Sequence, residues 1–361
     1  MNKLLKLDWV LIISVSLLLL ISMLIIYSIS FSGSVFNASN FQKQSISIII
    51  GILAMFFLSF FDYRLLNYHS TKLYFLMLLI LVAVIFLGKT VKGNTGWLEF
   101  FFFNVQPVEI AKIIIIIFLA SFLSKKKTQL SIIIRISASI VLIFIPVFLI
   151  LKQPDLGSSS VILSGWLVLL LASGLNKKNL ALLVIVGILA TSSSWFFLKD
   201  YQKNRIINFV KPQHDPMGSG YNVIQATIAV GSGGIFGKGL GHGSQSQLNF
   251  LPEKHTDFIF SVITEELGLL GALAIFIIFG IIFWRIKETA KLARDNFGYL
   301  ITLGILTILF FQFFINVGMN IGVMPVAGVP LPFLSYGGSS MVVMLSAIGL
   351  VQSVYIRRIK T

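Results

Sequence analysis

Residues 9–29, WVLIISVSLLLLISMLIIYSI, decide the fold class of this chain. The stretch contains no charged residue, and it is long enough to cross the hydrocarbon core of a bilayer, which takes about 20 apolar residues in a helix. It is too long and too uniformly apolar for the core of a signal peptide, and it has no small-residue cleavage site. We therefore expect a first transmembrane helix here.

Nine further apolar runs lie near 46–61, 73–88, 106–124, 129–150, 156–174, 179–198, 257–284, 298–321 and 337–356. The composition agrees, because 57% of the 361 residues are hydrophobic and only 11% are charged. Soluble domains carry about 25% charged residues. We predict an all-α polytopic membrane protein that forms a single domain over residues 1–361, with about ten transmembrane helices.

The basic residues predict the orientation of these helices. A net charge of +15 would suggest nucleic acid in a soluble protein, but here the basic residues gather in loops beside the spans, so we expect no nucleic-acid partner. One set of alternate short loops, which includes both termini, holds 16 lysines and arginines, whereas the other set holds only Lys43, Lys89, Lys92 and Lys152. Because basic loops remain in the cytoplasm, we predict that both termini are cytoplasmic.

The segment from about 199 to 256 then forms a large extracytoplasmic loop between helices 7 and 8. Loops of this length without secondary structure are usually functional or disordered, and we expect short surface helices within it, for example around 221–230. Its glycine-rich part, 231–243, is weak as a nucleotide motif because no strand precedes it and no Gly-Lys-Ser/Thr follows. It forms either a tight loop packed against the membrane or a backbone nest for a diphosphate.

The densest group of ionisable residues lies where this loop enters the eighth helix. Asp257 is either a helix cap or a carboxylate at the water–lipid boundary that a substrate with a membrane-embedded tail can reach. Glu265 lies about 12 Å deeper at 1.5 Å per residue, and we expect it to be a buried structural group. Burying a charge in a span is costly, so these positions are functional candidates by default.

Two further groups lie at the starts of the fourth and sixth helices. Glu109 and Lys112 are three residues apart, so they share a helix face and can pair. The alternative to a functional role is an ion pair that only stabilises the helix. Asp155 fits the N-cap position of the sixth helix, and capping alone could explain it.

The remaining candidates are basic residues on the outer side. Each could bind an anionic group near the outer leaflet or simply contact solvent and lipid headgroups; they are Lys203, Arg205, Lys211, Lys238 and Lys254. The chain has no cysteine, and its outer histidines have no close metal-ligand spacing. We therefore expect no zinc site and no organic cofactor.

Several stretches resemble one known family. They are Gln153-Pro154-Asp155-Leu156-Gly157, then 201–205, 215–221, 225–241, 245–260, 265–268 and 330–340. Together they resemble the SEDS (shape, elongation, division and sporulation) proteins over essentially the whole chain. The residues at 245–248 and the short tails resemble the RodA branch more than the division paralogue FtsW. One departure is Val108, where the family often has serine.

The resemblance implies a peptidoglycan glycosyltransferase that polymerises lipid II into β-1,4 glycan strands during elongation, at the outer face of the bacterial cytoplasmic membrane. The lipid diphosphate leaves without a protein acid, so one carboxylate could suffice as general base for the acceptor hydroxyl in an inverting reaction. That carboxylate is Asp257. The implied substrate-binding residues are Glu109, Lys112, Asp155, Arg205, Lys238, Lys254 and Ser335.

The resemblance also implies cofactors and partners. A divalent cation, Mg or Mn, for which Asp257 is a candidate ligand, or the loop's lysines and arginines would stabilise charge on the departing diphosphate. The partners would be lipid II, the nascent lipid-linked strand, a class B penicillin-binding protein (a transpeptidase) and other elongation-complex membrane proteins.

Two alternatives belong to other functional classes. A lipid II flippase would need an ionisable pathway across the whole bilayer, but the inner halves of the predicted spans hold few carboxylates. A scaffold that only recruits a transpeptidase would not explain why the carboxylates and bases concentrate on the outer side. The sequence therefore favours an enzyme.

Overall fold

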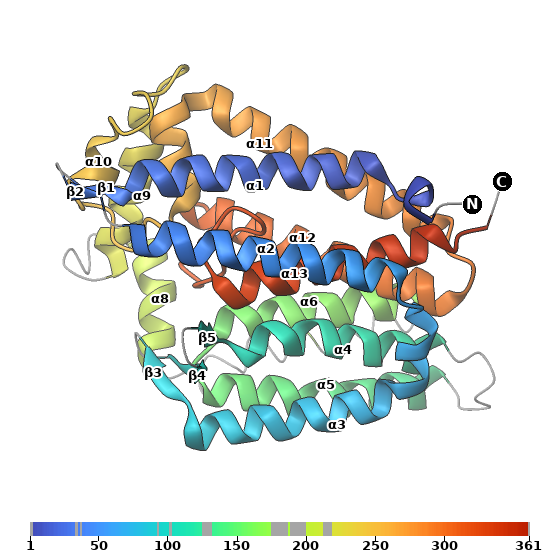
Figure 1. Cartoon of the computed structure of the whole chain (residues 1–361). Helices are drawn as coiled ribbons and strands as arrows, with labels where there is room; N and C mark the ends of the chain where they lie inside the picture. Colours follow the sequence, from blue (N-terminus) through green and yellow to red (C-terminus); the bar gives the residue numbers. More distant parts are fainter. Residues whose placement is uncertain are drawn as a thin grey trace.

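The computed structural model describes residues 3–32, 35–36, 38–91, 94–100, 103–124, 132–174, 187, 200–211 and 219–359. Its helices are η1 (Lys3–Lys6), α1 (Trp9–Ser30), α2 (Ala38–Phe60), α3 (Tyr63–Leu87), α4 (Pro107–Ser124), α5 (Ile132–Lys152), α6 (Leu156–Ala172), α8 (Asp200–Val210), α9 (Ser219–Ser232), α10 (Ser244–Gln247), α11 (Ile259–Lys291), α12 (Asn296–Asn320) and α13 (Gly338–Ile356). The long helices run side by side, and both chain ends lie at the same end of the bundle (Figure 1).

Eight of the described helices are long and apolar enough to cross a membrane, and α6 is a shorter apolar helix of 17 residues. This confirms the all-α polytopic class. The predicted seventh span, 179–198, lies outside the described residues, except for residue 187. The helix expected around 221–230 is present as α9.

The helices that contain the second and third predicted spans begin before the apolar runs do. α2 begins at Ala38 rather than near 46, and α3 begins at Tyr63 rather than near 73. The expected loop 62–72 is therefore helical after Asp62, whose side chain accepts a hydrogen bond from the Arg64 N–H and caps α3. Counting apolar runs detects only the part of a helix that lies in lipid, whereas a capped polar turn extends the helix beyond it.

Short strands were also not predicted. β1 (Phe31–Ser32) and β2 (Val35–Phe36) form a hairpin between α1 and α2. β3 (Lys89–Val91), β4 (Asn94–Phe100) and β5 (Phe103–Val105) form an antiparallel sheet in the order β3-β4-β5 between α3 and α4. All five strands lie at the end of the bundle opposite the termini (Figure 1).

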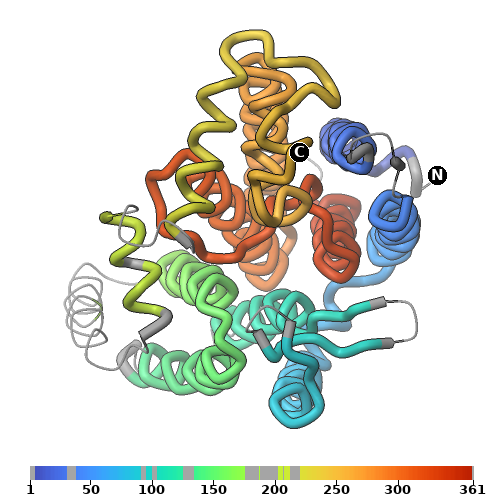
Figure 2. Tube along the Cα trace, turned by 90° about the vertical axis from the view of Figure 1, so that its left-hand side faces the viewer, coloured from blue at the N-terminus to red at the C-terminus, as the bar shows by residue number. Residues whose placement is uncertain are grey.

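The helices pack tightly at the centre of the bundle, where α12 and α13 are surrounded by the others (Figure 2). Glycines permit the close approach of α2 and α13: a Cβ added at Gly51 would collide with Leu345, and one at Gly349 with the backbone of Met55. Small residues at helix contacts are typical of membrane bundles, where close van der Waals packing replaces the hydrophobic effect.

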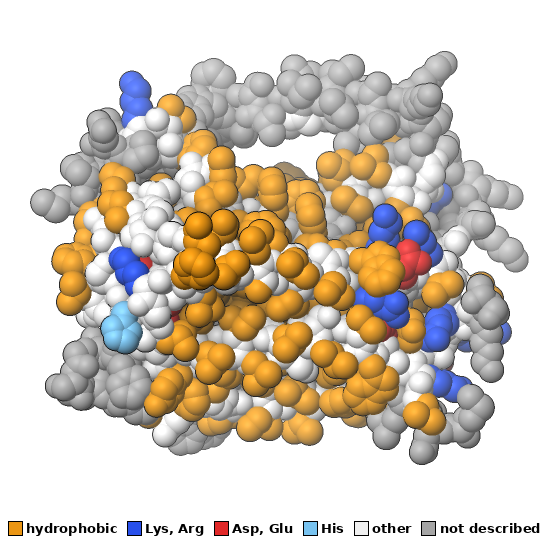
Figure 3. Space-filling model, turned by 90° about the horizontal axis from the view of Figure 1, so that it is seen from above, with side chains coloured by type: hydrophobic (Ala, Val, Ile, Leu, Met, Phe, Trp, Pro, Cys, Tyr) orange, Lys and Arg blue, Asp and Glu red, His pale blue; other side chains and the backbone are white. Residues whose placement is uncertain are grey.

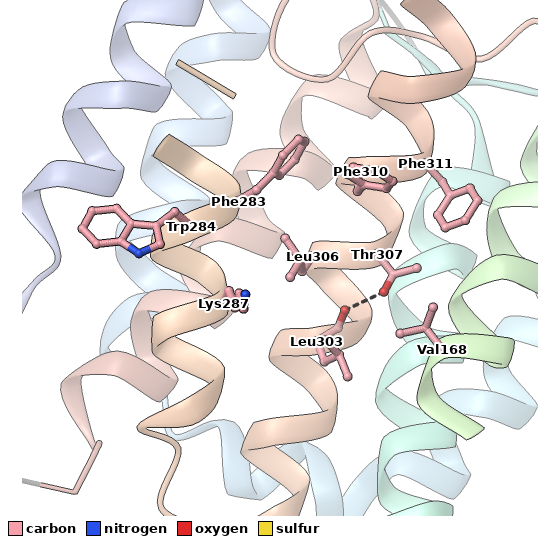
Figure 4. Close-up of a pocket in the computed structure, with 9 residues that line it drawn as sticks. All are labelled: Val168, Phe283, Trp284, Lys287, Leu303, Leu306, Thr307, Phe310 and Phe311. Atoms are coloured by element: carbon pink, nitrogen blue, oxygen red, sulfur yellow. Dashed lines mark hydrogen bonds between the residues drawn. The ribbon is translucent and has the colours of Figure 1, made fainter. Parts of the chain in front are cut away.

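The outer face of α1 and α11 is covered by hydrophobic side chains, with basic residues gathered toward the end that holds the termini (Figure 3). A pocket of about 480 Å³ lies between α6, α11 and α12 (Figure 4). It is lined mostly by apolar side chains such as Phe283, Phe310 and Phe311, with Lys287 at its edge. Phe283 lies 24 residues after Ile259, the first residue of α11, so this pocket is far along that helix from the Asp257 turn.

Candidate active site

Asp257 lies in a turn, 252–258, immediately before α11. Glu253 adopts a left-handed conformation with φ of 53°, and its carbonyl accepts hydrogen bonds from the N–H groups of Thr256 and Phe258. The N-cap of α11 is Phe258, which makes no side-chain capping bond. The alternative that Asp257 is the N-cap residue is therefore wrong, and its side chain is partly exposed.

Three consecutive carbonyl groups of this turn accept hydrogen bonds from residues outside the turn. The His255 carbonyl accepts from the Tyr336 N–H at 2.8 Å, and the Thr256 carbonyl accepts from the Ser335 hydroxyl at 2.6 Å. The Asp257 carbonyl accepts from the side-chain amides of Asn316 and Asn320, both at 3.0 Å. The backbone at Asp257 is thus fixed by α12 and by the segment before α13.

Ser335, predicted to bind substrate, takes part in this support. Its side chain is buried, and besides donating to Thr256 its hydroxyl accepts from the Leu331 N–H at 2.8 Å. The bond to Thr256 holds the Asp257 turn against the 331–336 segment, and the bond from Leu331 fixes the hydroxyl within that segment.

The segment 321–337, between α12 and α13, packs against both Asp257 and the start of α6. A Cβ built on Gly328, where φ is +66°, would lie 3.8 Å from Asp257 Oδ2, so the carboxylate lies over this glycine. A Cβ on Gly157, in the first turn of α6, would collide with the Ala327 carbonyl. The starts of α6 and α11 therefore pack on neighbouring residues of one segment.

Asp155 is the N-cap of α6, as predicted. Its Oδ1 accepts from the Ser158 N–H at 2.9 Å. Its Oδ2 accepts from the Gln106 side-chain amide at 3.4 Å, and Gln106 directly precedes α4. Asp155 therefore ties the start of α6 to the start of α4, beside the segment on which Asp257 lies.

Glu109 and Lys112 form the predicted pair in the first turns of α4. Their charged groups are 2.8 Å apart, and each side chain is only 1% exposed. Glu109 Oε2 has no hydrogen-bond partner among the described residues. Removing either partner would leave a buried, uncompensated charge, which typically costs about 3–5 kcal/mol.

Lys238 and Lys254, two of the three lysines predicted to bind substrate, hold the outer segments together. Lys238 donates to Glu265 at 2.9 Å and to Ser244 at 2.8 Å. Glu265 is fully buried, which confirms the prediction that it is a buried group. The Lys254 ammonium donates to the Ser246 carbonyl at 2.6 Å and to an Asn249 side-chain oxygen at 2.7 Å.

Lys254 lies in the Asp257 turn, and its side chain is only 7% exposed. Burial lowers the pKa of Lys254, an effect that the charge of Glu266 opposes.

Arg205 lies on α8 and is partly exposed, and the interactions between described residues do not join it to Asp257. The structure thus brings Glu109, Asp155 and Ser335 to the Asp257 end of the molecule, and α8, which carries Arg205, lies at the same end (Figure 1).

The glycine-rich segment 231–243 packs against a break in α11. At Gly268, φ is 66° and the helix is interrupted. The N–H groups of residues 238 and 239 donate to the carbonyls of residues 265 and 266, and those of residues 269 and 270 donate to the carbonyls of residues 234 and 235. A Cβ at Gly237 would collide with the Glu266 carbonyl, so glycine is required there.

These contacts decide between the two interpretations of the glycines. The N–H groups of residues 237, 238, 239, 241 and 242 all donate within the protein. A diphosphate nest needs such groups to point at the ligand. The loop is tight, as predicted, and packs against α11; its packing against the membrane stays a prediction, and the nest is wrong for these five groups.

Sequence reasoning missed Asn316 and Asn320. Both are fully buried, and they contact the Asp257 carbonyl from α12. The signal was two asparagines four residues apart in a mostly apolar span, which places them on one helix face. Polar residues inside a membrane helix are functional candidates in the same way as charged ones.

Comparison with known proteins gives a consistent set of relatives. The family model of the cell cycle proteins FTSW_RODA_SPOVE matches residues 7–359. The chain is 38% identical to the peptidoglycan glycosyltransferase MrdB of Escherichia coli over 346 residues, covering 95% of this chain and 93% of that protein. It is 38% identical to a probable peptidoglycan glycosyltransferase FtsW of Geobacter metallireducens, covering 88% of this chain and 84% of that protein.

Solved structures agree with these relatives. A chain of a peptidoglycan synthase complex that coordinates polymerization and crosslinking superposes with a TM-score of 0.82 at 31% identity, covering 98% of this chain and 99% of that one. The rod shape determining protein RodA of Thermus thermophilus gives a TM-score of 0.74 at 27% identity, covering 98% of both chains.

Proposed function

The chain belongs to the FTSW_RODA_SPOVE family of cell cycle proteins, and from this membership we propose how its residues carry out glycan synthesis. It is a peptidoglycan glycosyltransferase and a multi-pass membrane protein. Its substrate in our proposal is lipid II, which it polymerises into β-1,4 glycan strands. The observation that carries the mechanism is a partly exposed carboxylate, Asp257, on a backbone that four hydrogen bonds from outside the turn hold in place.

Asp257 is the general base in this mechanism. It removes the proton from the 4-hydroxyl of the acceptor sugar while that oxygen attacks the anomeric carbon of the donor. The new carbon–oxygen bond forms as the bond to the lipid diphosphate breaks, and the diphosphate leaves with the bonding electrons. Attack opposite to the leaving group converts the α-linked donor into a β link without a covalent enzyme intermediate.

The residues at the starts of α4 and α6 would line the acceptor or donor site. Asp155 and Gln106 connect those helix starts through a hydrogen bond, and the Glu109–Lys112 pair lies one turn below Gln106. Lys238, which is 29% exposed beside Glu265, and the partly exposed Arg205 are the basic residues most able to contact a diphosphate. Lys254, whose ammonium group donates to Ser246 and Asn249, stabilises the Asp257 turn.

A divalent cation, Mg or Mn, could bind at this site only if the substrate supplied part of its ligands. Among the described residues there is no group of three His, Asp or Glu that could hold a metal. Mg in phosphate-transfer sites is often held by one or two carboxylates together with substrate oxygens, and Asp257 would be the carboxylate here. When bound, such an ion would neutralise charge on the departing diphosphate.

The orientation follows from the charge distribution. Sixteen basic residues in the short loops of one side, against four on the other, support cytoplasmic termini in the bacterial cytoplasmic membrane. The termini lie at one end of the bundle, and α8, α9 and α10 lie at the opposite end (Figure 1). Asp257, which follows α10 and precedes α11, would then face the outside.

We further propose that the chain acts in elongation with a class B penicillin-binding protein and other elongation-complex membrane proteins. The similarity to a chain of a peptidoglycan synthase complex supports a partnered enzyme. Overall identity does not separate elongation from division, because a MrdB and an FtsW relative are both 38% identical. The residues at 245–248 support the elongation role.

The test is polymerisation of lipid II by the purified chain, with and without a class B penicillin-binding protein. We expect long glycan strands that muramidase cleaves, and more of them in the presence of the partner. Transbilayer movement of lipid II in proteoliposomes without any polymer, in either condition, would instead identify a flippase and contradict the proposal.

A further inference from the structure

Asn320 occupies an unusual place at the start of α11. Phe258 is the N-cap of α11, so the Ser261 N–H belongs to the first turn and has no acceptor within the helix. Here the Ser261 N–H donates to Asn320 Oδ1 at 3.0 Å, and Asn320 Nδ2 donates to the Asp257 carbonyl at 3.0 Å. The carboxamide of Asn320 therefore caps the first turn and links it to the residue that precedes the N-cap.

Asn316, one turn earlier on α12, makes a related bridge. Its Nδ2 donates to the Asp257 carbonyl at 3.0 Å and to the Val329 carbonyl at 2.8 Å. Val329 follows Gly328, over which the Asp257 carboxylate lies. A single amide thus fixes the backbone of Asp257 relative to the segment that its carboxylate faces.

We propose that Asn316 and Asn320 are positioning residues for the catalytic carboxylate. They hold the main chain of Asp257 so that the carboxylate keeps one place over Gly328. This inference rests on the proposed role of Asp257 as general base. Burying two amides in an apolar helix costs free energy unless they are hydrogen-bonded, and their donors are aimed at the residue that carries the chemistry.

The size of the effect follows from geometry. Displacing a catalytic group by about 1 Å can lower a rate about a hundredfold. Asn316→Ala and Asn320→Ala each remove one of the two donors to the Asp257 carbonyl, so we expect kcat for lipid II polymerisation to fall about 10- to 100-fold. KM should stay within about twofold to threefold, because neither amide is placed to contact the substrate.

Gln312 offers a matched control. It is one turn before Asn316 on α12 and fully buried, and its side-chain amide has no hydrogen-bond partner among the described residues. Gln312→Ala should therefore leave kcat within about threefold of the wild type, whatever it does to the thermal midpoint. A loss of kcat equal to that of the asparagine variants would contradict a specific positioning role.

A double-mutant cycle separates positioning from general support of the fold. In full-length protein in detergent, Asn320→Ala is measured in the wild-type and in the Asp257→Asn background. If Asn320 acts through Asp257, the second change lowers the residual rate by less than about twofold once the base is gone. A further loss as large as in the wild-type background would refute the inference.

The outcomes also separate this inference from the proposed function. If Asp257→Asn keeps wild-type activity, the general-base role is wrong and the inference falls with it. If Asp257→Asn is inactive but both asparagine variants keep wild-type kcat, only the inference is wrong. Should an alanine variant fail to fold, Asn316→Ser and Asn320→Ser replace it, because a serine hydroxyl can bond to its own helix while being too short to reach Asp257.

Discussion

Replacing Asp257 with asparagine separates chemistry from structure. The change preserves the size of the side chain but removes its ability to accept a proton. The N-cap of α11 is Phe258, and the turn is held through the carbonyls of residues 255–257 by partners outside it. Loss of a helix cap, about 1 kcal/mol, is therefore not expected, and the thermal midpoint should stay close to that of the wild type.

The expected loss of activity is much larger. A general base contributes about 10² to 10⁴ in rate, which corresponds to about 2.7–5.4 kcal/mol in the activation free energy at about 1.36 kcal/mol for each factor of ten. We expect Asp257→Asn to lower glycan synthesis at least about a hundredfold while lipid II binding is retained. Both quantities are measured on one detergent preparation.

Asp295→Ala provides the opposite control. Asp295 caps α12 by accepting from the Gly298 N–H at 2.7 Å, and it accepts from the Tyr63 hydroxyl at 2.7 Å, at the other end of the bundle. This variant should lower the thermal midpoint and leave kcat near the wild-type value. If instead Asp257→Asn polymerises lipid II within a few-fold of the wild type, Asp257 is not the general base and the mechanism proposed above is wrong.

Three further predictions use other parts of the molecule. Exchanging the charges of the buried pair, Glu109→Lys with Lys112→Glu, keeps the pairing but moves each charge; activity should stay lost, and its recovery would show that the pair is only structural. A cysteine at the exposed Ser244, in a chain without native cysteine, should react with an impermeant thiol reagent in intact spheroplasts; labelling only after lysis would reverse the topology. Gly237→Ala should lower the free energy of unfolding by about 1–3 kcal/mol, since φ is +79° and the added Cβ meets the Glu266 carbonyl. Gly231→Ala should not lower it, since no atom lies within 4 Å of the added Cβ. Equal thermal midpoints for the two variants would contradict the packing of this loop.

Features that depend on neighbours in the sequence were predictable. The apolar length of α1 requires a membrane-spanning helix, and the spacing of Glu109 and Lys112 places them on one face of α4. Asp155 could be recognised as a cap because a capping side chain bonds within its own first turn. In each case the residues that interact are within four positions of one another.

The site around Asp257 could not be derived in this way. Ser335 contacts Thr256 from 79 residues away, and Asn316 contacts Asp257 from 59 residues away. No local periodicity encodes such pairs. Sequence pattern suggested a cap for Asp257 because an aspartate precedes a helix, whereas long-range donors occupy the backbone of that turn and leave the capping position to Phe258.

Charge type alone does not show which acceptor a lysine contacts. Lys238 and Lys254 were predicted to bind substrate because they are basic and lie outside, which stays a prediction; in the folded chain their ammonium groups contact Glu265 and the carbonyl of Ser246. An ammonium near the membrane surface donates hydrogen bonds to whichever acceptor the fold places nearby, and only the folded chain shows which acceptor that is. The partly exposed Asp257 lies where buried groups from α12 and the 331–336 segment converge on its backbone, so the rigidity of this turn is a stronger indication of catalysis than the number of charges around it.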